Sequence, residues 1–251
     1  MKREYWYILI AYTIMLFSGY LIVNPALLIA QRAGVDIQAI AMPVSIYWTF
    51  FSFTAALVLV LYLLRKEFKR EDTLRGPKAN LGLSISWAVG GVFLAFIAQA
   101  AAISIENALG IKAGSENTGD ILKIIEMAPM FIIVSSIIGP ILEEIVFRKI
   151  IFGSIYKKTN FILAGLISSL IFGVAHGEME HILIYTMMGF TFAFLYVKTN
   201  RILVPIIAHV TMNTLVVITQ IAIQDEHSAG QLFSIIGGFL NGFCWGIVGV
   251  L

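Results

Sequence analysis

Long apolar runs separated by short polar stretches make up most of the chain. A helix that crosses a bilayer needs about 20 mostly apolar residues, and most of these runs reach that length. The pattern predicts an all-α polytopic membrane protein with about eight transmembrane helices, forming a single membrane domain over residues 1–251. The candidate spans are Trp6–Ala30, Met42–Leu64, Leu81–Ile105, Met130–Phe152, Phe161–His176, Ile182–Val197, Ile202–Ile223 and Leu232–Leu251.

The fifth and sixth candidates are shorter than the others and share a polar hinge at Gly177–His181. A tilted or partly re-entrant pair of helices would also fit this pattern, so seven spans remain the alternative. The hinge carries Glu178, Glu180 and His181, and we expect these side chains to contact water.

The fourth candidate belongs to a helical stretch that is too long for one span. Ile121–Tyr156 contains 36 residues, which is about 54 Å of helix against a hydrocarbon core of about 30 Å. Pro129 and Pro140 are the natural breaks, because proline cannot donate the helical hydrogen bond. We therefore expect Ile121–Ala128 to lie on the outer surface as an amphipathic segment, the span to begin near Pro129, and a kink at Gly139–Pro140.

Composition narrows the class of protein. Charged residues form 13% of the chain and apolar residues 59%, whereas an ordinary soluble domain is roughly 25% charged. A soluble protein of this length has too little interior to bury so much apolar surface. This excludes a soluble enzyme, a disordered chain and a nucleic-acid-binding module. The single cysteine, Cys244, excludes an internal disulfide framework and a Cys-rich zinc site.

The basic residues are distributed unevenly, and this predicts the orientation. With the N-terminus in the cytoplasm, twelve Lys and Arg residues fall in cytoplasmic segments and only three in outer loops. Such an excess is typical of cytoplasmic loops. Both termini are then cytoplasmic if there are eight spans. The twelve residues are Lys2, Arg3, Arg65, Lys66, Lys69, Arg70, Arg75, Lys78, Lys157, Lys158, Lys198 and Arg201.

Three charged residues, Glu143, Glu144 and Arg148, lie within the fourth candidate span. Each charge costs roughly 2.5–3.5 kcal/mol near the bilayer centre, so pairing or a polar cavity must offset the cost. Glu144 and Arg148 are four residues apart and share a helix face, which predicts an ion pair. Glu143 points about 100° away from Glu144 and is left without that partner. The alternative is that both acids belong to one ion-pair network between helices.

His176 ends a Phe-Gly-Val-Ala-His sequence at the end of the fifth candidate span. A histidine in a membrane helix often hydrogen-bonds a neighbouring helix, and this structural role is one interpretation. A metal site built from His176, Glu180 and His181 is another, because residues four or five apart can converge.

His209 and Asn213 are four residues apart and therefore lie on one helix face. The Asn NH₂ group and the imidazole are both hydrogen-bond donors. Two aligned donors in an apolar site can stabilise a developing oxyanion, while an interhelical hydrogen-bonded pair is the structural alternative. No serine has a base beside it in the sequence, so activation of water by a carboxylate is the simplest chemistry that these residues allow.

The three motifs occur in a fixed order: Glu-Glu-x-x-x-Arg at 143–148, Phe-x-x-x-His at 172–176 and His-x-x-x-Asn at 209–213. Together they resemble the CPBP (Abi) family, which contains CAAX prenyl proteases and bacteriocin-processing enzymes. The resemblance covers roughly residues 120–220, the predicted catalytic core.

The resemblance implies a glutamate-dependent intramembrane endopeptidase that needs no metal or other cofactor. Glu143 would be the general base that activates water, and His176 would help to bind that water. His209 and Asn213 would form the oxyanion hole. The supporting positions would be Glu144, Arg148 and Phe172.

The expected partners are a peptide or membrane-protein substrate and the lipid bilayer. The family suggests maturation of a bacteriocin or quorum-sensing peptide, self-immunity or CAAX-type processing, in a bacterial plasma membrane. Two of the three motifs fall in the inner half of their spans and His176 nearer the outer end, so we expect a site open to the cytoplasm. The alternatives are a zinc metalloprotease with Glu143, His176 and His209 as ligands, and a non-catalytic membrane scaffold or immunity protein.

Overall fold

The computed structural model describes residues 1–68, 74–112 and 114–224, and this part of the chain contains helices and turns but no strand. Three segments have π-helical geometry, namely η1 (Gly19–Val23), η2 (Val134–Ile138) and η3 (Glu144–Phe152), and η4 (Met179–His181) is a 3₁₀ turn. The α-helices are α1 (Arg3–Ser18), α2 (Asn24–Arg32), α3 (Ile37–Phe68), α4 (Leu81–Ala108), α5 (Glu116–Met127), α6 (Phe131–Ile133), α7 (Gly139–Glu143), α8 (Gly153–Tyr156), α9 (Phe161–Ala175), α10 (Ile182–Thr199) and α11 (Leu203–Gln224).

The prediction of an all-α polytopic membrane protein is confirmed. Five helical stretches of the described chain are long and apolar enough to cross a membrane, and the apolar α9 is shorter. The predicted eighth span, Leu232–Leu251, lies outside the described residues. The number eight and the cytoplasmic N-terminus therefore stay predictions. The five stretches are Arg3–Arg32, Ile37–Glu67, Leu81–Ala108, Met179–Thr199 and Leu203–Ala222.

The long fourth stretch is divided at Pro129, as predicted, while helical structure continues through Pro140. α5 is a separate helix with Leu122 and Ile125 buried and most of its other side chains exposed. Helical structure then resumes at Phe131 and runs through α6, η2, α7, η3 and α8. The π-helical segment η2 directly precedes Gly139–Pro140. Pro140 cannot donate the helical hydrogen bond, and its ring crowds the carbonyl of the preceding turn. The wider π-helical turn at η2 relieves this crowding.

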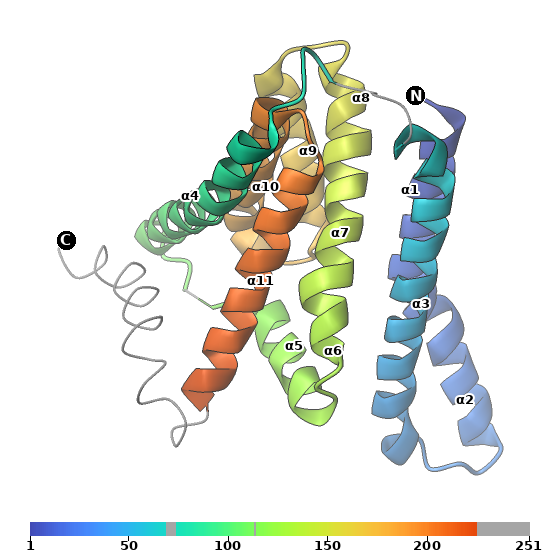
Figure 1. Cartoon of the computed structure of the whole chain (residues 1–251). Coiled ribbons are helices and arrows are strands. Elements are labelled where there is room, and N and C mark those ends of the chain that lie inside the picture. Colours follow the sequence, from blue (N-terminus) through green and yellow to red (C-terminus); the bar gives the residue numbers. More distant parts are fainter. Residues whose placement is uncertain (69–73, 113, 225–251) are drawn as a thin grey trace.

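Two packed groups of helices flank this fourth helix. α1 and α3 lie together on one side of it, and α4, α9, α10 and α11 lie on the other (Figure 1). One apolar core joins α1 and α3 to the fourth helix through residues such as Ile8, Val60 and Ile150. A second core joins α4, α10 and α11. The fourth helix, which carries the acidic motif, is therefore enclosed from both sides.

α9 and α10 form an antiparallel hairpin that packs closely. A Cβ atom at Gly165 would come within 2.7 Å of the Phe190 ring, and one at Gly189 within 2.9 Å of the Cβ of Ser169. The absent side chains let the two helices approach each other. Gly177, with a φ of +78°, makes the turn that follows α9. α9 has only 15 residues, or about 22 Å, so it is too short to cross the hydrocarbon core alone.

Candidate active site

Glu144 and Arg148 form the buried centre of the site. Both side chains are fully buried, and the Nε of Arg148 lies 3.2 Å from the Oε2 of Glu144. The predicted ion pair is confirmed, although it forms within the π-helical segment η3 and not in a regular α-helix. The guanidinium carbon of Arg148 also lies 4.5 Å from the centre of the Phe172 ring, where the negative face of the ring attracts a cation. Phe172 thus helps to hold the pair in place.

His209 reaches this pair from α11. Its Nδ1 lies 3.0 Å from the Oε1 of Glu144, and its ring stacks on Phe192 at 4.5 Å between ring centres. An ionised carboxylate only accepts hydrogen bonds, so Nδ1 carries the proton that Glu144 binds. These two contacts fix the orientation of the imidazole. They also determine that Nδ1 is the nitrogen that bonds to Glu144. Its other nitrogen, Nε2, faces Glu143 at 3.8 Å from Oε2.

Glu143 differs from its neighbour in every one of these respects. Its side chain is 20% exposed, whereas that of Glu144 is fully buried. The structure pairs Arg148 with Glu144, and in the described chain we find no ion pair between Arg148 and Glu143. The separation of 3.8 Å from His209 is too long for a direct hydrogen bond. The prediction that Glu143 lacks the arginine partner is confirmed.

His176 is held at the end of α9 by its own helix and by α10. Its Nδ1 lies 2.8 Å from the carbonyl oxygen of Phe172, so Nδ1–H donates that bond. One face of the ring stacks on Tyr185 with 4.0 Å between ring centres and an angle of 26°. The Phe172 ring contacts it edge-on at 4.4 Å. Nε2 is then the nitrogen left for another molecule, and in the neutral ring it is an acceptor.

The apparent mismatch in depth between His176 and Glu143 disappears in the folded chain. The fourth helix continues to Tyr156, so Glu143 lies thirteen residues before its end, and His176 lies fifteen residues after the start of α9. Glu143 and His176 therefore lie at similar distances from the turn that joins the fourth helix to α9. The Phe172 ring links the motifs, because it contacts His176 and also lies 6.2 Å from His209.

Asn213 lies one turn beyond His209 on α11, and its side chain is partly buried. Within the described residues, we find no hydrogen bond that uses its amide group. The amide remains available to a ligand, and the helix places it on the same face as His209.

Sequence reasoning missed two aromatic side chains of α10 that shape the site. Tyr185 supports His176, and Phe192 supports His209. They are seven residues apart and thus lie on one face of α10. That spacing was the available signal, but an aromatic stripe in a membrane helix is usually packing, so nothing in the sequence singled them out.

The expectation that the hinge side chains contact water holds for Glu180 but not for His181, and the metal site suggested by one interpretation of His176 is not formed. His181 does not contact water freely but is 92% buried, and its Nδ1 lies 2.8 Å from Oε2 of Glu106 at the end of α4. Glu180 is exposed. The metal site proposed from His176, Glu180 and His181 is not formed, since His181 is committed to Glu106. Throughout the described part of the chain, no group of three His, Cys, Asp or Glu side chains is placed to hold a metal ion.

Comparison with known proteins identifies relatives over nearly the whole chain. A family described as type II CAAX prenyl endopeptidase Rce1-like matches residues 125–215. YdiL of Bacillus subtilis (strain 168), a candidate membrane peptidase by name, is 49% identical over 95% of this chain and 99% of its own length. The membrane-embedded CAAX protease MroQ of Staphylococcus aureus (strain USA300) is 34% identical over 86% of this chain and 90% of its own length. No solved structure gives a significant match.

Proposed function

Because the chain belongs to the Rce1-like family of CAAX proteases and is an integral membrane protease, we propose that it is a glutamate-dependent endopeptidase in which Glu143 activates the attacking water. The family membership supports the protease activity. The identity of the base, the supporting histidines and the substrate are our proposals.

The observation that carries the proposal is the different surroundings of two adjacent carboxylates. Glu144 is fully buried and bound by both Arg148 and His209. A general base must reach its water and exchange a proton with it, and Glu144 has no freedom to do either. Glu143 keeps partial exposure, and among the described residues its ion-pair contact is with Nε2 of His209, at 3.8 Å.

The geometry between Glu143 and His209 suits a small polar molecule. A gap of 3.8 Å between Oε2 and Nε2 is one that a water bound to both atoms spans with hydrogen bonds of ordinary length. In the proposed reaction, the water oxygen bonds to the scissile carbonyl carbon while its proton passes to Glu143. Glu143 then gives this proton to the amide nitrogen as the carbon–nitrogen bond breaks. His176 binds the water through Nε2.

The oxyanion that forms in this step needs donors. Asn213 provides its NH₂ group, and His209 provides Nε2–H when the ring carries both protons. Since Nδ1–H is already bound to Glu144, the second proton makes the ring an imidazolium, whose charge the neighbouring carboxylates balance. Each such donor is worth about 10²–10³ in kcat in other enzymes.

We propose a short or membrane-associated peptide as the substrate. The candidates are a bacteriocin, a signalling peptide such as a quorum-sensing peptide, and a CAAX-type tail. The relatives from Bacillus subtilis and Staphylococcus aureus support a bacterial plasma membrane, and the Lys and Arg distribution supports a site open to the cytoplasm.

The test compares the peptides of cells that express the wild type, Glu143→Gln or Glu180→Gln, the last being a matched control in which an exposed acid outside the site is changed. Glu143→Gln should abolish processing at normal membrane abundance, with a loss of about 10²–10⁴-fold, while Glu180→Gln should process normally. Processing by Glu143→Gln at the wild-type rate would reject the assignment and favour a scaffold. Activity that chelators abolish and zinc restores would favour the metalloprotease.

A further inference from the structure

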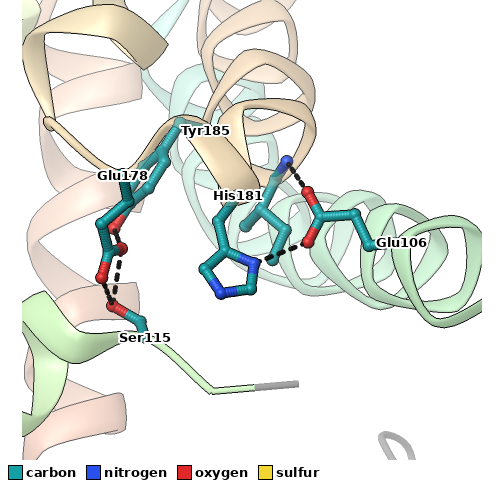
Figure 2. Close-up of polar contacts among 6 residues, drawn as sticks. Glu106, Ser115, Glu178, His181 and Tyr185 are labelled. Atoms are coloured by element: carbon teal, nitrogen blue, oxygen red, sulfur yellow. Dashed lines mark hydrogen bonds and ion pairs between the residues drawn. The ribbon is translucent and has the colours of Figure 1, made fainter. Parts of the chain in front are cut away.

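The turn after α9 holds a carboxylate that binds three donors from two other elements. Glu178 accepts a hydrogen bond of 2.8 Å from the Ser115 hydroxyl and one of 2.8 Å from the backbone N–H of Asn117, both at the start of α5. It accepts a third, of 2.5 Å, from the Tyr185 hydroxyl on α10. Figure 2 shows Glu178 between Ser115 and Tyr185, with the two side chains on opposite sides of the carboxylate. One side chain thus links α5, the hinge and α10.

Tyr185 connects this link to the candidate active site. Its hydroxyl binds Glu178, while its ring stacks on His176 at 4.0 Å. The imidazole is then fixed by the Phe172 carbonyl at Nδ1, by the Phe172 ring at its edge and by Tyr185 on its face. Of these three contacts, only the one from Tyr185 comes from another helix.

We propose that Tyr185 and Glu178 are positioning residues that orient His176, and that they make this orientation depend on the docking of α5. The proposal rests on the proposed function, in which Nε2 of His176 binds the attacking water. If α5 leaves the hinge, Glu178 loses two of its three donors, the tyrosine hydroxyl loses a fixed acceptor, and the ring beneath His176 is no longer held.

The charge state of Glu178 suits this role. Burial acts to raise the pKa of its carboxyl, but the donors from Asn117, Tyr185 and Ser115, with the nearby His181, outweigh burial and hold the pKa below its usual value. The carboxylate therefore stays ionised at neutral pH and accepts all three bonds. Hydrogen bonds to an ionised acceptor are stronger than those between neutral groups.

The first experiment separates the ring of Tyr185 from its hydroxyl. Tyr185→Leu removes the stacked ring and should lower kcat about 10²-fold, the size expected when a reacting group is displaced by about 1 Å. Tyr185→Phe keeps the ring but loses its bond to Glu178, and should lower kcat less than Tyr185→Leu does. KM should change little in both variants, because His176 acts on the water and not on ground-state binding of the peptide. A Tyr185→Phe variant as inactive as Tyr185→Leu would overturn the role of the stacked ring.

The second experiment does not depend on turnover. The stacked tyrosine ring should shift the His176 ring protons upfield in the NMR spectrum of histidine-labelled protein, with His176→Gln identifying the signal. Tyr185→Leu should remove the shift, and Tyr185→Phe, which keeps the ring but loses the hydroxyl bond to Glu178, should reduce it partly. Glu178→Gln and Ser115→Ala should reduce it partly, while the control Glu180→Gln should leave it unchanged.

The two experiments distinguish this proposal from the function on which it rests. If the shift disappears in Tyr185→Leu but kcat is unchanged, the positioning role is rejected while the protease mechanism stands. If the wild type shows no upfield shift, the orientation itself is rejected. If Glu143→Gln still processes peptides, the proposed mechanism fails, whatever the spectra show.

Discussion

Two carboxylate–histidine pairs lie in different parts of this protein and look alike at first. In the inner pair, Nδ1 of His209 lies 3.0 Å from Glu144. In the outer pair, Nδ1 of His181 lies 2.8 Å from Glu106. All four side chains are buried and each pair joins two helices that are distant in the sequence. A buried carboxylate beside a histidine therefore does not by itself mark an active site.

The difference between the pairs lies in what surrounds them. The outer pair, drawn in Figure 2, is completed by a backbone group, because the N–H of Ile184 approaches Glu106 at 3.4 Å. The inner pair is completed by Arg148 and faces a second carboxylate, Glu143, that is left partly exposed. We expect catalysis beside the inner pair, because it faces a carboxylate, Glu143, that is not committed to the pair. The outer pair faces no such carboxylate among the described residues.

The largest expected contrast comes from replacing the two histidines by the same residue. His209→Gln should reduce turnover by about 10²–10⁴-fold, because it removes the imidazole that faces Glu143. His181→Gln should leave turnover per folded molecule nearly unchanged. Both are measured as peptide processing normalised to membrane abundance. Equal losses in the two variants would erase the proposed distinction between the pairs.

A second contrast concerns the stability of the inner pair. Arg148→Leu leaves the fully buried Glu144 without its cation, and breaking a buried ion pair in this way costs about 3–5 kcal/mol. Unfolding in detergent micelles measures the loss, with Arg32→Leu as the control because Arg32 is exposed. An equal free energy of unfolding for the two variants would show that Arg148 does not stabilise the centre of the site.

The outer pair should be affected less. Glu106→Leu leaves the buried Nδ1–H of His181 without its acceptor, and one unsatisfied buried donor costs about 1–3 kcal/mol. The longer bond from the part-buried Ile184 N–H, at 3.4 Å, adds little. The same unfolding assay applies, with exposed Glu126→Leu as the control. Turnover per folded molecule should persist. Its complete loss would show that the outer pair takes part in catalysis.

The smallest expected effect is that of pH on the hinge. The pKa of Glu178 is held below its usual value in the folded protein, so its contribution to stability is fully present above about pH 4.3, the ordinary glutamate value. It is lost as the pH falls through the lower folded pKa. The amide proton of Asn117, which binds Glu178, should report this titration by NMR. The titration should vanish in Glu178→Gln, and a midpoint above 4.3 would contradict the assignment.

Local features of the sequence determined the class of protein and part of the site. The long apolar runs require helices in a membrane, because a bilayer leaves backbone groups no other partners. The four-residue spacing of Glu144 and Arg148 was sufficient to predict their pair, since neighbours on one helix turn meet wherever that helix lies. Pro129 likewise marked the break between α5 and α6, because a missing N–H acts locally.

Only the tertiary structure decided which groups meet across helices. His209 reaches Glu144 from 65 residues away, and His181 finds Glu106 instead of joining His176. Tyr185 and Glu178 gain their importance only because α5, the hinge and α10 come together. Such contacts depend on the rotation and relative height of packed helices, and the π-helical geometry of η3 alters that rotation. Helix periodicity could therefore identify Glu143 as the unpaired acid, but only packing placed His209 opposite it.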